Sequence, residues 1–349
     1  MHDHYTVLGI AKDADAATIR AAFHALALRF HPDKCPGDKA AEERFKEITA
    51  AHEVLADAAR RAQYDRLGHA YSLAPVAFVI AGKTVTLDPE PTFSGDLSDV
   101  YRALDEAGTE VAVKVGKNAL DSDLLLAEVK TLRTIYPADA KDEKFYRYLP
   151  RVVASGKLAD GRVITVLPWL GEYHSLAEVL SAHYMGIEAE DAVWIFKRIL
   201  AGLGFVHRQG VVHGAVIPEH VLVHPVSHGA KLVDWSYSVK AGGKVCALAS
   251  GRDGIYAPEI LAKQAVSPAT DILMAVRTVL RVLSPDAPTW FVTFLRGCLF
   301  VNPARRPQDA HGLHEEFDTL VKKKLGPPKY HQFNMPPRAQ AGGVSHGRK

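Results

Sequence analysis

The sequence predicts a multidomain chain in which an all-α unit precedes a larger α+β unit. In the first seventy residues, apolar positions recur at helical spacing through "DADAATIRAAFHALALRF" and "KAAEERFKEITAAHEVLAD". Beyond residue 92, strand-like stretches such as "VAVK" alternate with amphipathic stretches such as "AEDAVWIFKRILAGLGFVH". The 349 residues, of which 48% are hydrophobic, suffice for two domains with their own cores.

Composition and charge exclude several classes of protein. Lys and Arg number 42 against 40 Asp and Glu, a net charge of +2 that gives no indication of nucleic-acid binding. The cysteines, Cys35, Cys246 and Cys298, lack metal-ligand spacing, so we expect no zinc site, no disulfide framework and a reducing compartment. "MHDHYTVLGI" is too polar for a signal peptide, and no apolar run reaches about 18 residues. We therefore expect a soluble, cytoplasmic protein without membrane contact.

The all-α unit is predicted to be a helical hairpin. Asp13 or Asp15 can cap its first long helix, which ends where Pro32 forces His31 out of helical geometry. A second long helix and a short basic one follow the loop "HPDKCPGDK". This arrangement predicts that His31 and Asp33 lie at an exposed tip.

The whole segment resembles the J domain of DnaJ-type co-chaperones. The resemblance rests on "YTVLGI", "ALRFHPDK" and "AHEVLADAARRAQYDRLG", which occur in this order. An isolated His-Pro-Asp tripeptide would be a solvated turn, but these surrounding motifs imply a docking site. The resemblance implies that a DnaK-type heat-shock chaperone binds here and that its ATPase is stimulated. The implied contact residues are His31, Pro32 and Asp33, with Arg20 and Arg29 on the preceding helix supplying electrostatic steering.

The sequence departs from the J-domain family in two ways. Ala21, Ala22 and Ala25 interrupt the basic residues that relatives carry on this helix, which predicts weaker docking or docking tuned to one chaperone. No Gly/Phe-rich segment follows residue 70, and no four-cysteine repeat exists to hold zinc. The usual substrate-binding parts are missing, so client selection is expected to reside in the second unit.

A buried ion pair is expected at the start of the second unit. Residues 71–91 read as a join between domains that contains strand-like segments. Lys114 then follows the apolar residues of "VAVK", and a buried strand seldom hosts an unpaired ammonium group. On the next helix Leu124, Leu125 and Leu132 mark the buried face, and Glu128 is the acid that turns inward with them. We therefore expect a Lys114–Glu128 pair.

Residues 92–320 resemble the protein-kinase fold, an α+β fold of two lobes. In kinases the Lys–Glu pair orients the nucleotide phosphates. The remaining motifs follow in kinase order: a hinge-like "LPWLGEY", the loop "VVHGAVIPEHVLV", then "KLVDWS", "YAPE" and "NPARRP". The resemblance assigns roles to four further residues: Asp234 as metal-binding acid, Glu259 and Arg306 as a structural pair, and Asp271 as anchor of the catalytic loop.

The loop "VVHGAVIPEHVLV" lacks the residues that catalyse phosphoryl transfer. His213 is retained, but Ala215 replaces the Asp that accepts the substrate proton, a role worth roughly a hundred- to ten-thousand-fold in rate. Ile217 replaces a Lys that stabilises the transferring charge, and His220 replaces the Asn that holds a second magnesium ion. Of the three glycines of the phosphate-binding loop only Gly95 remains. We therefore predict a degenerate, kinase-like domain, a pseudokinase.

Four retained residues predict residual nucleotide binding. Lys114, Glu128 and Gly95 could still meet the phosphates, and Asp234 could hold one magnesium ion, so ATP with magnesium is the expected cofactor. The alternative for Lys114 and Glu128 is a structural ion pair that holds the lobes together. Asp234 is the most informative of the four, because an acid at the end of an apolar strand has little structural purpose.

The expected organisation is a J domain (1–70), a join (71–91), a kinase-like domain (92–320) and a tail (321–349). The tail loses periodicity and gains Pro, Gly and basic residues, so we expect it to be disordered.

The leading functional hypothesis is a co-chaperone adaptor whose pseudokinase domain selects an unidentified client. The alternative is an atypical kinase-fold transferase, either a divergent phosphotransferase or a nucleotidyl transferase, in which Asp234 and His213 or His220 take altered roles. A third hypothesis is a nucleotide-regulated signalling scaffold.

Overall fold

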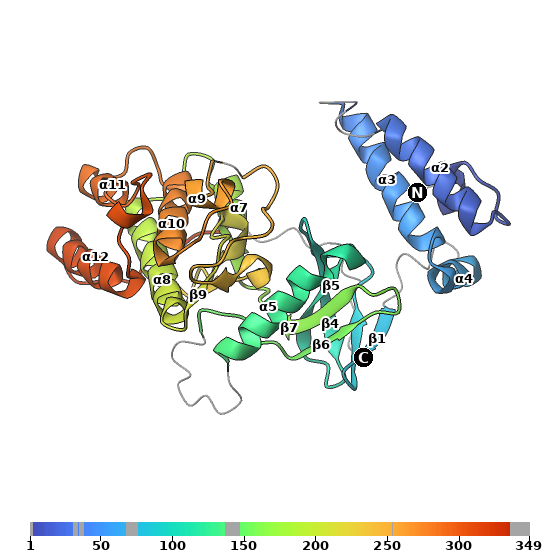
Figure 1. Cartoon of the computed structure of the whole chain (residues 1–349), viewed down its shortest axis with the longest axis horizontal. Helices are drawn as coiled ribbons and strands as arrows, with labels where there is room; N and C mark the ends of the chain where they lie inside the picture. Colours follow the sequence, from blue (N-terminus) through green and yellow to red (C-terminus); the bar gives the residue numbers. More distant parts are fainter. Residues whose placement is uncertain are drawn as a thin grey trace. The chain divides into compact units, whose positions relative to one another are not determined.

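The computed structural model describes residues 3–30, 34, 38–67, 76–136, 147–252 and 254–335 (Figure 1). The chain forms two compact units: one comprises residues 1–76 with 88–90, and the other comprises 77–87 with 91–349. Within the described ranges, no helix combines the length and the apolar character needed to cross a bilayer.

The first unit is built from four helices. They are α1 (His4–Leu8), α2 (Ala16–Phe30), α3 (Lys39–Leu55) and α4 (Ala58–Leu67), and Figure 1 shows α2 and α3 side by side as a hairpin. Of the two predicted caps, Asp15 accepts a hydrogen bond from the Thr18 backbone N at 2.7 Å. Ile19 and Ile48 are fully buried between the helices. His31, Pro32 and Asp33 lie outside the described residues, as does Cys35.

The second unit begins with an antiparallel sheet. Its strands are β1 (Val76–Ile80), β2 (Lys83–Leu87), β3 (Phe93–Ser94), β4 (Ser98–Asp105), β5 (Glu110–Gly116), β6 (Ala154–Lys157) and β7 (Val163–Pro168). Their order is β1-β2-β4-β5-β7-β6, and β3 pairs with the N-terminal part of β4. The helix α5 (Ser122–Ile135) follows β5 and contacts β7.

The expected boundary at residue 92 differs from this arrangement. β1 and β2 are strands of the sheet, and β2 pairs with β4 from Val85 to Leu87. Ile80, Val85 and Leu87 are buried in the core of the sheet. The apolar alternation in this stretch reflects burial against the sheet, so 77–87 belongs to the second unit and not to a join.

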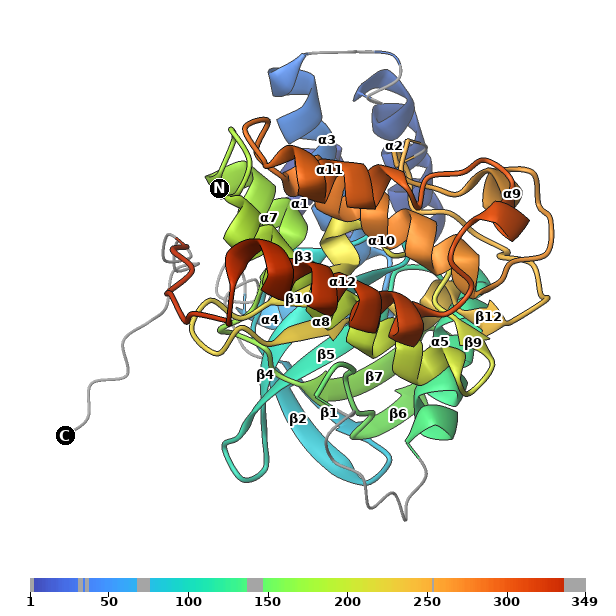
Figure 2. The same cartoon turned by 90° about the vertical axis from the view of Figure 1, so that its left-hand side faces the viewer.

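The rest of the second unit is a helical lobe. Its helices are α7 (Leu176–Ala182), α8 (Ala189–His207), α9 (Pro258–Leu261), α10 (Pro268–Val282), α11 (Thr289–Arg296) and α12 (Ala310–Leu325). Figure 2 shows α12 lying across α8, and α8 also contacts α10, which is buried along most of its length. Short strands carry the loops of the site: β8 (His174–Ser175), β9 (Val211–Val212), β10 (Val221–Val223), β11 (Ala230–Leu232) and β12 (Val239–Lys240).

The start of the expected disordered tail is ordered. α12 continues to Leu325, and Phe333 is only 2% exposed. The Tyr330 hydroxyl donates to the Val226 carbonyl at 3.0 Å, and His331 Nε2 lies 2.7 Å from an Asp191 carboxylate oxygen. Aromatic anchors therefore fix the chain as far as residue 335, and the expectation of disorder was wrong for 321–335. Residues 336–349 lie outside the described part of the chain.

Candidate functional site

Lys114 is the centre of the candidate site. It lies on β5, is 5% exposed, and its Nζ donates to Glu128 Oε2 at 2.7 Å and to Asp234 Oδ1 at 2.8 Å. The Ser236 hydroxyl lies 3.2 Å away. Burial alone would lower the pKa of Lys114, but the carboxylates of Asp234 and Glu128 outweigh burial and raise it above its usual value. Lys114 is therefore a permanent cation between two acids.

Glu128 joins α5 to the segment that follows Asp234. Leu125 and Leu132 on the same helix face are buried, and they carry Glu128 inward to 1% exposure. Its Oε1 accepts the Trp235 backbone N–H at 3.0 Å, and its Oε2 accepts from the Ser236 hydroxyl at 3.3 Å. The expected Lys114–Glu128 pair is formed, and Ser236 is a further partner that no local pattern indicated.

Asp234 combines a strained backbone with side-chain contacts to Lys114 and His220. It follows β11 with left-handed backbone angles (φ 58°, ψ 66°), a conformation that costs a non-glycine residue about 1–2 kcal/mol. Its Oδ2 lies 3.3 Å from His220 Nε2, while its Oδ1 binds Lys114. Burial would raise the pKa of Asp234, but Lys114 and His220 hold it well below its usual range. Backbone strain of this kind is concentrated at functional sites in proteins.

The degenerate loop turns its replaced side chains into the core. Ala215 is 0% exposed and Ile217 is 1% exposed, so neither side chain faces the cleft. His220 closes the loop, since its Nδ1 lies 2.9 Å from the Ala215 carbonyl oxygen. Of these replacements, only His220 reaches Asp234.

Asp271 on α10 anchors this loop through hydrogen bonds to the loop backbone. Its carboxylate accepts the backbone N–H groups of His213 at 2.7 Å and Gly214 at 2.9 Å, and His207 Nε2 lies 2.8 Å away. His213 is fully buried, its Nε2 lies 3.1 Å from the Val233 carbonyl oxygen, and burial lowers its pKa to about 4. A buried, neutral His213 cannot contact a substrate, which argues against an altered catalytic role for it.

The turn between β3 and β4, where the sequence predicted phosphate binding, contacts the segment that precedes α9. Gly95 donates its backbone N–H to the Ser98 carbonyl at 2.9 Å and forms the turn between β3 and β4. In the same turn, an Asp96 carboxylate oxygen accepts the Ser250 backbone N–H at 2.6 Å. Two residues on, Arg252 binds Glu219 of the degenerate loop at 2.6 Å. These two contacts were not anticipated, because partners more than thirty residues apart leave no local signal.

The remaining expected pair lies in the helical lobe. Arg306 donates to both carboxylate oxygens of Glu259, at 2.6 Å and 2.9 Å, and both residues are 3% exposed. The Arg306 guanidinium also binds the Phe300 and Val301 carbonyls. The pair therefore fastens α9 to the chain that leads into α12.

The two expected steering arginines lie on different sides of α2. Arg20 and Arg29 are both exposed, and at about 100° of rotation per residue their nine-residue spacing places them roughly half a turn apart. The Arg20 Nε donates to the Ala16 carbonyl at 3.2 Å, and the Arg29 guanidinium lies 5.3 Å from the centre of the Phe30 ring. One partner surface can therefore face only one of the two directly.

The chemistry of the site suits one magnesium ion at most. Magnesium prefers oxygen ligands and is commonly held by one or two carboxylates together with nucleotide phosphates. Asp234 offers such a carboxylate, but the neighbouring position holds the His220 imidazole. In the part of the chain that the structure describes, no three His, Cys, Asp or Glu side chains form a group that could hold a metal ion by themselves.

Comparison with known proteins identifies the first unit. The model of the DnaJ domain matches residues 3–65. This segment is 60% identical over 67 residues to the chaperone protein DnaJ of Bdellovibrio bacteriovorus, covering 19% of this chain and 18% of that protein. It is 55% identical over 67 residues to the chaperone protein DnaJ of Clostridioides difficile, covering 19% and 17%. The chain thus spans less than a fifth of the length of these relatives.

The second unit matches a different family. The model of the protein kinase domain matches residues 94–293. The solved structure of vaccinia related kinase 3 superposes with a TM-score of 0.53 at 17% identity, over 72% of this chain and 91% of that one, which shows a shared fold. The predicted order of an all-α J domain and an α+β kinase-like fold is confirmed. The chain belongs to the protein kinase domain family and carries a DnaJ domain at its N-terminus.

Proposed function

We propose that this protein is a co-chaperone adaptor. Its J domain recruits a DnaK-type heat-shock chaperone and stimulates the ATPase of that chaperone, and its kinase-like domain selects the client without transferring phosphate. The observation that carries this proposal is the burial of Ala215 and Ile217, at 0% and 1% exposure, where a kinase needs an acid and a cation facing the cleft.

The contacts of the acids near the loop support this proposal. Asp234 is bound by Lys114 and His220, and its lowered pKa makes it a poor proton acceptor. Asp271 is 0% exposed and binds loop backbone. Glu219 binds Arg252 through Oε1 only, since its Oε2 has no hydrogen-bond partner among the described residues. Two of these three acids are thus committed to structural contacts.

The same geometry supports nucleotide binding. Lys114 is charged, buried and positioned by Glu128, as the phosphate-binding lysine of a kinase must be. Asp234 would hold one magnesium ion, which would neutralise phosphate charge when bound. Binding without transfer is physically consistent, because the retained groups stabilise the ground state and the lost ones stabilise the transition state.

One feature favours the alternative of an atypical kinase-fold transferase. Lys114, Glu128 and Asp234 form a complete set of contacts, and a domain with a purely structural role would not need it. A divergent phosphotransferase or nucleotidyl transferase would use this set with His220 beside Asp234. This alternative requires ATP turnover, and the adaptor requires only binding.

We propose that this protein resides in the cytoplasm. Cys246 and Cys298 are both free thiols, as expected where the environment is reducing.

The adaptor proposal is tested by ATP hydrolysis of a DnaK-type chaperone from the same organism. We expect the full chain to accelerate hydrolysis, and His31→Gln or Asp33→Asn to abolish the acceleration while the circular dichroism spectrum stays unchanged. Crosslinking in a lysate should recover partners with the wild-type chain and also with the His31→Gln chain, because client selection resides in the second unit. Acceleration that survives both substitutions would remove the proposed role of the J domain.

A further inference from the structure

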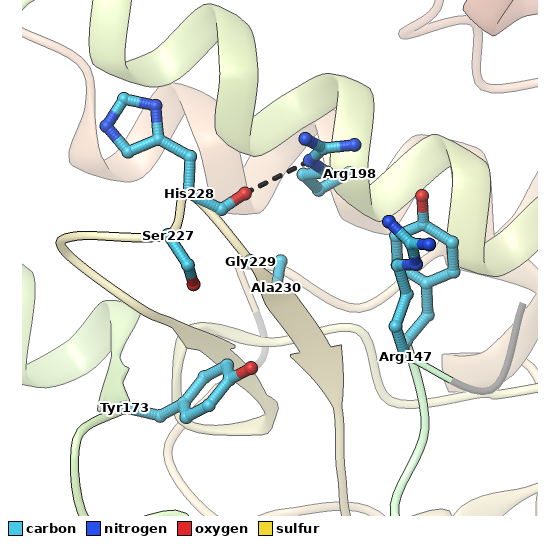
Figure 3. Close-up of a pocket in the computed structure, with 8 residues that line it drawn as sticks. Arg147, Tyr173, Arg198, Ser227, His228, Gly229 and Ala230 are labelled. Carbon is cyan, nitrogen blue, oxygen red and sulfur yellow. Dashed lines mark hydrogen bonds between the residues drawn. The ribbon is translucent and has the colours of Figure 1, made fainter. Parts of the chain in front are cut away.

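A second pocket lies in the helical lobe, away from Lys114 and Asp234. Its volume is about 490 Å³, within the range of small-ligand sites. Figure 3 shows its walls: the chain before β6, the chain after β7, helix α8 and the turn between β10 and β11. The lining residues that matter for its chemistry are Arg147, Tyr173, Arg198, Ser227, His228 and Gly229.

Two arginines give the pocket positive charge. The Arg198 Nε on α8 donates to the His228 carbonyl at 3.0 Å, which fixes the guanidinium at the pocket wall (Figure 3). Arg147 is exposed, and the Lys231 ammonium holds its backbone carbonyl at 2.8 Å. Among the described residues, no carboxylate binds either guanidinium, and no Asp or Glu lines the pocket. Within the described residues, no carboxylate therefore offsets the charge of the two arginines.

Two hydroxyl groups converge on the opposite wall. A methyl group at Gly229 would lie 3.2 Å from the Tyr173 hydroxyl oxygen and 3.3 Å from the Ser227 hydroxyl oxygen. A side chain at residue 229 would therefore crowd both hydroxyls. The pocket thus offers hydroxyl donors on one wall and guanidinium donors on the other.

The turn that carries Ser227 and Gly229 is rigid. His228 has a left-handed backbone (φ 49°), which is costly for a non-glycine residue. Its ring stacks on Trp194 at 4.4 Å between centroids, and its backbone N–H donates to the His224 carbonyl at 3.1 Å. Strain maintained by packing in this way preorganises a binding site.

We propose that this pocket binds the phosphate group of a phosphorylated ligand. A phosphate dianion presents three acceptor oxygens and is matched by two guanidiniums with added hydroxyl donors, whereas a single carboxylate is satisfied by one guanidinium. The neighbouring acid, Glu172, does not oppose this binding strongly, because its side chain is 86% exposed and contacts His224 at 3.0 Å. The site is separate from the nucleotide cleft and does not depend on it.

The test is isothermal titration calorimetry on the full chain at low ionic strength. The probes are free phosphoserine and a short phosphoserine peptide, each compared with its unphosphorylated form. We expect only the phosphorylated probes to bind, and Arg147→Ala to weaken them by about tenfold or more, because charge-assisted hydrogen bonds are lost. Gly229→Ala should also weaken binding, since its methyl group crowds both hydroxyls.

One control separates this site from others. Arg296→Ala removes an exposed arginine of α11 and should leave binding unchanged. Equal affinity of the two phosphorylated probes would identify a small phosphorylated molecule as the source, and tighter peptide binding would identify a phosphorylated protein. Absence of phosphate-dependent heat, or unchanged binding by Arg147→Ala, would overturn the proposal.

Discussion

Replacing Lys114 with methionine removes the charge at the centre of the site but keeps the length of the side chain. The side chains of Lys114 and Glu128 are 6% and 2% exposed, so loss of the ammonium leaves Glu128 as a buried carboxylate close to that of Asp234. Removing one partner of a buried ion pair lowers the free energy of unfolding by about 3–5 kcal/mol. At roughly 2–4 °C per kcal/mol for a domain of this size, the melting temperature of the kinase-like domain should fall by roughly 6–20 °C.

Urea unfolding followed by tryptophan fluorescence measures this loss in the correct domain. The 4 tryptophans all lie at residue 169 or later, so the J domain contributes no signal. Lys117→Met is the matched control, because Lys117 is 37% exposed and its pairing with Asp99 at 3.4 Å is worth less than about 1 kcal/mol. Adding Glu128→Gln to Lys114→Met should restore part of the stability. A Lys114→Met protein as stable as Lys117→Met would refute the reasoning.

Three further predictions concern the buried histidine His213, the Glu259–Arg306 ion pair and nucleotide binding. Burial lowers the pKa of His213 to about 4, so between about pH 6.5 and 4 the unfolded chain binds a proton that the folded chain does not. The stability of the fold should therefore fall as the pH drops from about 6.5 towards 4. His213→Gln should flatten this dependence when melting temperatures are measured over a pH series. Arg306→Ala leaves Glu259 buried and unpaired and should cost about 3–5 kcal/mol in urea, whereas Arg305→Ala should cost much less. ATP with magnesium should raise the melting temperature of the kinase-like domain, and Asp234→Asn should remove the part of this increase that depends on magnesium. An increase of the same size when a chelator removes magnesium would contradict the role of the Asp234 carboxylate.

Much of the site could be predicted because its residues serve physical needs that are visible locally. An ammonium in an apolar strand needs an acid, and the helix that follows offers Glu128 on its buried face. Asp234 stands out in the same way, as an acid at the end of an apolar strand. The structure brings Glu128 and Asp234 together around Lys114.

The parts that the sequence did not reveal depend on contacts between distant segments. β1 and β2 carry a strand pattern, but the pattern does not say which sheet they join. Phe333 lies in a Pro-rich, basic stretch whose composition suggested disorder, yet its burial at 2% exposure and the hydrogen bonds of Tyr330 and His331 fix the stretch. The pocket at Arg147 and Arg198 is assembled from four separate segments, so no motif marks it.

The central claim is that the kinase-like domain does not transfer phosphate. Incubation of the full chain with γ-labelled ATP, magnesium and generic protein acceptors tests it most directly, with Asp234→Ala measured in parallel. The account predicts label at background level in both proteins, because Ala215 stands where a kinase has its general base and both Ala215 and Ile217 are buried. Robust label with the wild-type chain that disappears in Asp234→Ala would contradict it and establish an atypical kinase.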